Sequence, residues 1–71
     1  MKGDTMDFQE KVRVRIEHWI RHNEDHLQEY EELAGELDQA GENESAKHIT
    51  NMVALVEESN QYLRRALETL T

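Results

Sequence analysis

The sequence predicts an all-α fold: an antiparallel two-helix hairpin that pairs with a second copy as a four-helix bundle. The 71 residues include no proline and only three glycines, so little interrupts a helix. Apolar residues recur at spacings of three and four in both halves of the chain. Gly41 and Asn43 lie between the two patterned stretches and are typical of a helix end and a helix start. We therefore expect a single helical-hairpin domain over residues 1–71, with helices at about 8–39 and 44–70 and a turn at about 40–43.

The second half has the more regular pattern. Its repeat positions, separated by three and four residues in turn, are Ala46, Ile49, Val53, Val56, Asn60, Leu63, Leu67 and Leu70. This is the a and d repeat of helices that pack along a seam. Further apolar residues at Met52, Leu55, Tyr62 and Ala66 widen the stripe beyond one narrow seam.

The first half repeats the pattern less cleanly. Its expected seam is Val12, Ile16, Trp19, Asn23, His26, Tyr30, Leu33 and Leu37, widened by Ile20, Leu27 and Ala34. Asp7 and Glu10 have the spacing of a capping box at the start of a helix near Phe8. The stretch from Lys11 to Ile16 also alternates polar and apolar residues, so an extended arm before Ile16 is the alternative.

Antiparallel pairing of the two seams gives a register in which the numbers of facing residues add up to about 83. This register places Asn23 opposite Asn60, each the only amide in its seam. A matched polar pair can fix alignment and oligomeric state, so we expect a structural polar pair here. The alternative is that each amide reaches out to solvent. Because both stripes are wider than one neighbour can cover, we expect a homodimer.

Charge and composition exclude several classes of function. The net charge of −8 argues against binding to nucleic acid, which needs a basic surface. The chain has no cysteine, no signal-peptide pattern and no apolar run of membrane-spanning length, so we expect a cytoplasmic protein without membrane contact. Nine acids and no lysine or arginine fall within residues 22–46. The hairpin would thus have an acidic turn end and a partly basic open end, which favours an antiparallel dimer.

Three histidines at four-residue spacing, His18, His22 and His26, are the strongest chemical signal. Residues four apart lie on the same helix face, so adjacent members can bind one divalent transition metal such as nickel, cobalt or zinc. His22 and His26 form the best pair, with Asp25 and Glu29 as candidate carboxylate ligands. The outer two histidines lie roughly 12 Å apart along a helix, so all three can serve one ion only with a partner chain. The alternative for these residues is a solvated helix face.

The spacings of catalytic metal sites are absent. Helical zinc proteases require Glu directly after the first histidine, where this chain has Asn23. Di-iron bundles require Glu three residues before a histidine, and no histidine here has one. We therefore expect a protein that is not an enzyme.

The run His18-Trp19-Ile20-x-His22-Asn23-x-x-His26 resembles the His-Trp-x-x-His-Asn-x-x-His signature of a family of small bacterial and archaeal helical domains of unknown function. The similarity extends over roughly residues 12–70 and includes an asparagine and a leucine-rich end in the second helix. Some members of that family are linked to nickel-binding accessory proteins of carbon monoxide dehydrogenase. The family pattern often has proline before His-Trp, whereas this chain has Glu17, which lets the helix continue upstream.

Two functions follow as hypotheses. The first is a small metal-binding or metal-handling protein, with a possible protein partner in metal delivery. The second is a structural or interaction module without a metal, whose histidines are surface or pH-sensing groups. Metal binding would be lost below about pH 6, because protons compete with the metal for imidazole nitrogen.

Overall fold

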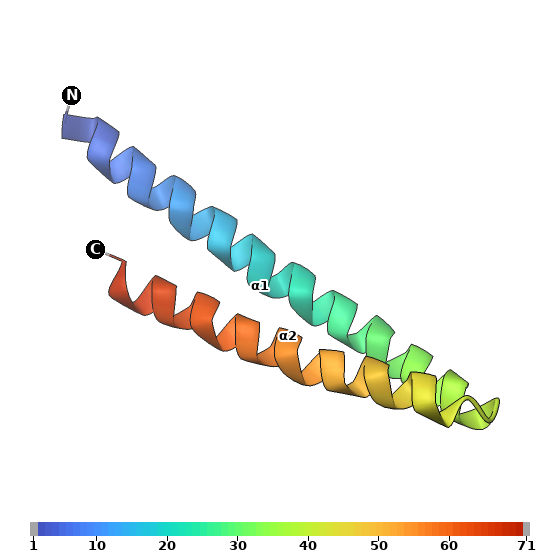
Figure 1. Ribbon diagram of the computed structural model, residues 1–71. Coiled ribbons are helices and arrows are strands. Elements are labelled where there is room, and N and C mark those ends of the chain that lie inside the picture. The colour runs from blue at the N-terminus through green and yellow to red at the C-terminus, as the bar shows by residue number, and fades with distance from the viewer. Residues whose placement is uncertain (1, 71) are drawn as a thin grey trace.

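The chain folds as two long antiparallel helices that pack side by side in an elongated hairpin (Figure 1). The computed structural model describes residues 2–70, and the side chains of residues 7–70. Helix α1 spans Lys2–Gln39 and helix α2 spans Asn43–Thr69. The Cα extents are 60 × 16 × 11 Å, and the N-terminal end of α1 projects beyond the end of α2. The two-helix hairpin predicted from the sequence is therefore confirmed. Neither α1 nor α2 has an apolar stretch long enough to cross a bilayer.

Helix α1 begins earlier than the sequence pattern suggested. It starts at Lys2 and not near Phe8, and the alternating stretch at residues 11–16 is helical and not an extended arm. Asp7 and Glu10 lie inside the helix and so do not form a starting cap. Because no proline precedes residue 16, nothing in the covalent chain stops the helix from continuing to Lys2.

The turn between the helices is closed by Gly41. Its φ of +83° lies in the left-handed region that glycine adopts without strain. The amide of Gly41 donates to the carbonyl of Asp38 at 3.1 Å, and that of Glu42 donates to the carbonyl of Leu37 at 2.8 Å. This pair of bonds is the Schellman motif, which satisfies the last carbonyls of α1. The expected helix stop at Gly41 is thus confirmed. Asn43, expected as a cap, is instead the first residue of α2, and its amide donates to the Asp38 carboxylate.

Two glycines provide a matched test of this turn. Gly41→Ala should destabilise the hairpin by about 1 kcal/mol, because alanine at positive φ is strained. Gly35→Ala should stabilise it by about 1 kcal/mol, because Gly35 is helical and a Cβ there meets nothing within 4 Å. Urea denaturation followed by circular dichroism measures both changes. Equal effects of the two substitutions would contradict this account of the turn.

The interface between the helices follows the predicted seam on α2. The eight repeat positions from Ala46 to Leu70 are buried or half-buried, and Ala46, Val53 and Asn60 are the most enclosed. A repeat of three and four residues keeps one face of α2 against α1 along its whole length.

On α1 some buried residues differ by one position from those predicted for the seam. Ile16, Ile20 and Ala34 are buried, whereas Trp19 is 47% exposed and Leu33 43% exposed. His26, also assigned to the seam, has a side chain 40% exposed. A single neighbouring helix covers only a narrow stripe, so the wider apolar face of α1 is divided. Its centre packs against α2, and its flank remains open.

Candidate metal site

The three histidines form a continuous row along the outer flank of α1. The ring centroids of His18 and His22 lie 5.8 Å apart and those of His22 and His26 lie 4.4 Å apart. The ring of Tyr30 continues the row, stacked on His26 at 5.7 Å. The regular helix places these side chains one turn apart, so the sequence spacing is realised directly in space.

His22 and His26 are arranged so that two ring nitrogens could bind one metal ion. Their Nε2 atoms lie 2.9 Å apart and share an N–H···N hydrogen bond, whose proton a metal ion would replace. Two nitrogens bound to one zinc ion at about 2.0–2.1 Å lie about 3.3–3.4 Å apart in tetrahedral geometry, and about 2.9 Å apart at a right angle. The pair is therefore within about half an ångström of the spacing that one ion requires. Small rotations of exposed side chains would close that difference.

Glu29 contacts the opposite nitrogen of His26. Its Oε1 lies 3.2 Å from Nδ1 of the ring, so the protonated Nδ1 donates to the carboxylate. In the neutral imidazole this leaves the lone pair on Nε2, the atom that faces His22. Metal-binding histidines commonly have this arrangement, with a carboxylate that orients the ring from behind. Glu29, expected as a candidate ligand, lies in this structure beside Nδ1 of His26, the ring nitrogen that does not face His22.

The other candidates do not converge on the same point. Among residues 7–70, no group of three or more histidine, aspartate or glutamate side chains is placed to hold one ion. Asp25 makes no hydrogen bond to either histidine in this part of the chain, and it borders an open hollow with Gln28, Glu29 and Glu32. His18 stacks beside His22 without sharing its Nε2 contact. The site therefore offers two nitrogens and leaves the remaining coordination positions open.

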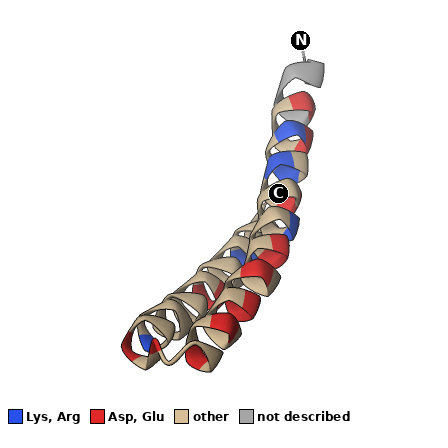
Figure 2. Ribbon diagram, turned by 90° about the vertical axis from the view of Figure 1, so that its right-hand side faces the viewer, with Lys and Arg blue, Asp and Glu red and all other residues tan. Residues whose placement is uncertain are grey.

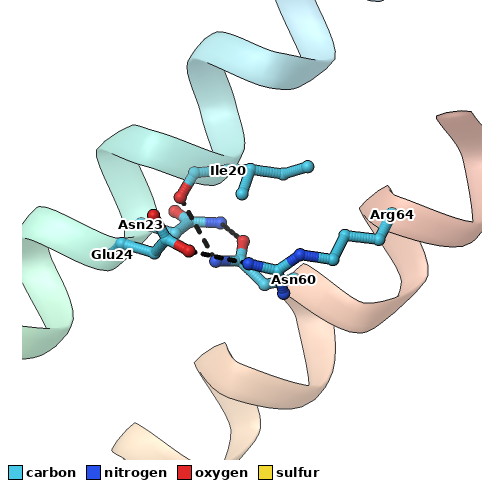
Figure 3. Close-up of polar contacts among 5 residues, drawn as sticks. All are labelled: Ile20, Asn23, Glu24, Asn60 and Arg64. Atoms are coloured by element: carbon cyan, nitrogen blue, oxygen red, sulfur yellow. Dashed lines mark hydrogen bonds and ion pairs between the residues drawn. The ribbon is translucent and has the colours of Figure 1, made fainter.

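A buried amide pair fixes the backbone behind the histidines (Figure 3). Nδ2 of Asn23 donates to Oδ1 of Asn60 at 2.7 Å, and Nδ2 of Asn60 donates to the backbone carbonyl of Ile20 at 3.2 Å. Asn60 is only 2% exposed, so these bonds satisfy polar atoms that water cannot reach. The structure thus brings together the two asparagines that the register prediction placed opposite each other. Asn23 lies between His22 and His26 in the chain, so the pair anchors this turn of α1.

An exposed ion pair joins the two helices at the same height along the hairpin as the asparagine pair. Nη2 of Arg64 donates to Oε2 of Glu24 at 2.7 Å (Figure 3). Both side chains are about half exposed, so the contribution of the pair to stability is small. It marks one edge of the interface between the helices, and the histidines lie toward the opposite edge.

Comparison with known proteins identifies a family. A family model described as a domain of unknown function (DUF8180) matches residues 12–70. The match covers the histidine row, the amide pair and both helices apart from the first residues of α1. No curated protein and no solved structure matches the chain.

Proposed function

The chain belongs to the DUF8180 family of domains of unknown function, and we propose that its paired histidines bind a divalent transition metal. The observation that supports this best is the 2.9 Å contact between Nε2 of His22 and Nε2 of His26, with Glu29 behind the second ring. Neutral imidazole binds zinc, copper, nickel and cobalt ions, and we take nickel, cobalt and zinc as the candidates. His18, one turn away, is a secondary ligand that would pair with His22.

The open coordination positions suit metal handling more than permanent structural binding. Structural zinc sites usually have four protein ligands, whereas this pair supplies two from an exposed helix flank. Water or groups from another protein chain would complete the coordination. An ion held in this way can pass to a protein partner with few bonds broken. We therefore propose a role in metal delivery or buffering.

We also propose that two hairpins associate as a four-helix bundle. Trp19, Leu55 and Tyr62 are large, apolar and about half exposed or more in the single hairpin. A bundle would remove such side chains from water, which is favourable by about 25 cal/mol for each Å² of apolar surface buried.

A second candidate function is that of an interaction module without a metal. The observation that favours it is the same open apolar flank, which could bind another helical protein. The two candidates differ in one respect that can be measured directly. A module without a metal would associate identically in the presence and absence of a chelator, and its histidines would give no heat with metal ions.

Calorimetric titration of the metal-stripped protein with nickel and with zinc at pH 7.5 tests the proposal. We expect micromolar or tighter binding, at one ion per chain or one per two chains, that weakens as the pH is lowered because protons compete with the metal for imidazole nitrogen. The absence of heat above buffer for both metals would overturn the proposal.

Two carboxylate variants sharpen this titration. Glu29→Ala should weaken binding by about tenfold, because loss of a carboxylate that hydrogen-bonds a metal-binding histidine typically costs about 10–100-fold and this one is well exposed. Asp25→Ala removes the same charge from the same helix without a contact to either ring, so it should leave the affinity nearly unchanged. Equal losses in both variants would indicate that the acidic surface attracts the ion without specific orientation of His26.

A further inference from the structure

The exposed apolar side chains of the hairpin lie on one side. Successive residues of a helix are rotated by about 100°, which places the flanks of each helix relative to the buried seam. On this basis, Glu24 and Arg64 share one edge of the interface, as their ion pair confirms. The opposite edge has five of the six large apolar residues exposed within residues 7–70. We call this side the tryptophan face, and its members are Phe8, Trp19, Leu33, Leu55 and Tyr62.

Charge is distributed unevenly along the length of the hairpin. Residues 22–60, which form the turn-end half, contain eleven acids and one lysine, a net charge of −10. The remaining residues form the open end and contain seven basic and five acidic residues, a net charge of +2. Figure 2 shows basic residues gathered on the N-terminal part of α1 and acids along the rest of the hairpin.

We propose that the tryptophan face binds a second copy of this chain in antiparallel orientation, with the turn end of each copy beside the open end of the other. This arrangement specifies the four-helix bundle proposed above and rests on it. Each half with a charge of −10 then lies beside a half with a charge of +2. The alternative, with both turn ends together, would place two strongly acidic halves in contact, and like charges across an interface are costly.

The lengths of the helices locate the two-fold axis. Helix α1 extends to Lys2, whereas the hairpin register places the end of α2 near residue 14 of α1. About a dozen residues of α1, including Phe8, are thus left without a neighbour in their own chain. An axis near the level of Asn23 and Ser59 lets this projecting segment of each copy cover the turn end of the other. Each Trp19 then lies at about the level of Leu55 of the opposite copy, and the packed faces cover both of these exposed apolar groups.

The axis also determines which helices pack together. The two-fold axis lies between the two tryptophan faces and runs perpendicular to the long axes of the hairpins. It therefore packs α1 of one copy against α1 of the other, and α2 against α2. Met52, Ser59 and Ala66 are spaced one heptad apart on the flank of α2 that faces this interface. Ser59 would then lie near its own counterpart, and Met52 near Ala66 of the other copy.

Oxidative cross-linking tests this geometry without interference, because the natural chain contains no cysteine. Ser59→Cys should form disulfide-linked dimers readily, since a disulfide needs Cα atoms within about 7 Å. Met52→Cys alone and Ala66→Cys alone should not, because the counterparts would lie roughly 21 Å apart along the rods. A mixture of these two variants should give the mixed disulfide. Gln61→Cys, on the ion-pair side, is the matched control and should not cross-link.

The experiment is run with chelator present, so that it is independent of metal binding, and is combined with sedimentation equilibrium of the natural chain. A dimer that gives no Ser59→Cys product, or one in which Met52→Cys cross-links alone, overturns the antiparallel arrangement but leaves a four-helix bundle standing. A monomer at tens of micromolar overturns the bundle itself. Failure to bind nickel or zinc, measured separately, would leave both results intact.

Discussion

His22→Ala should weaken binding of nickel and zinc by at least about 100-fold, since even loss of a group that only hydrogen-bonds a metal ligand costs about 10–100-fold. The substitution leaves one imidazole where the ion needs two, because Nε2 of His22 is the only side-chain nitrogen facing Nε2 of His26 within the described chain. His26→Ala should also weaken binding, but by less, because His18 and His22 remain as a second pair. Calorimetry at pH 7.5 measures both, and circular dichroism confirms that the exposed substitutions leave the helices intact.

Two other histidines serve as controls for this result. His48→Ala removes an imidazole from α2, far from the pair along the rod, and should not change the affinity. His18→Ala should reduce it only slightly, because His18 stacks beside His22 without sharing the Nε2 contact. If His18→Ala abolished binding while His26→Ala did not, the ion would lie one turn earlier than we propose.

Asn60→Ala should lower the free energy of unfolding by about 2 kcal/mol or more, since it removes one buried and one part-buried hydrogen bond and leaves a small cavity. The amide of Asn23 would lose its partner, and the carbonyl of Ile20 would lose one donor. Urea denaturation at fixed protein concentration measures the change. Gln61→Ala, an exposed neighbour in the same helix, should have an effect within about 0.5 kcal/mol.

A double substitution separates burial from hydrogen bonding at this position. Asn23→Leu combined with Asn60→Leu should recover most of the lost stability, because a well-packed apolar pair often equals a buried polar pair. Loss of stability in the double variant equal to that of Asn60→Ala would indicate that the amide bonds themselves hold the helices together. An unchanged urea midpoint in Asn60→Ala would contradict the structural role of the pair.

The sequence predicted helix α2 well because that helix has one dominant neighbour. Its strict repeat of three and four residues from Ala46 to Leu70 coincides with the less exposed positions of the structure. The turn was also predictable, since only Gly41 in that region tolerates a φ of +83° without strain. The register followed from antiparallel pairing of the two seams, and it placed Asn23 opposite Asn60, whose polar atoms strongly favour a shared partner once buried.

Helix α1 was harder to predict because its apolar stripe is wider than the surface that α2 covers. Trp19 and Ile20 are both suitable core residues, and the sequence does not indicate which one the single neighbour buries. The start of the helix was placed too late because Asp7 and Glu10 match a capping pattern that also occurs inside helices. In the structure Ile20 belongs to the covered seam, whereas Trp19 lies on the open tryptophan face.

The site was predictable in position but only partly in role. Four-residue spacing on a helix is sufficient to bring His22 and His26 together. It does not reveal which ring nitrogen faces outward, and that depends on Glu29 three residues after His26. The spacing of three between a histidine and a following glutamate was the available signal for an orienting carboxylate. Asp25 was included because it is near in sequence, but it makes no hydrogen bond to either histidine.

X-ray absorption spectroscopy of the nickel-loaded and zinc-loaded protein is the most direct test of the central claim. We predict a first shell of nitrogen and oxygen at about 2.0–2.1 Å, with the outer-shell scattering of at least two imidazole rings for each ion. In His22→Ala that imidazole scattering should fall or the bound ion should disappear. A shell of oxygen alone, without imidazole scattering, would contradict the account, because the ion would then be held by the acidic surface and not by His22 and His26.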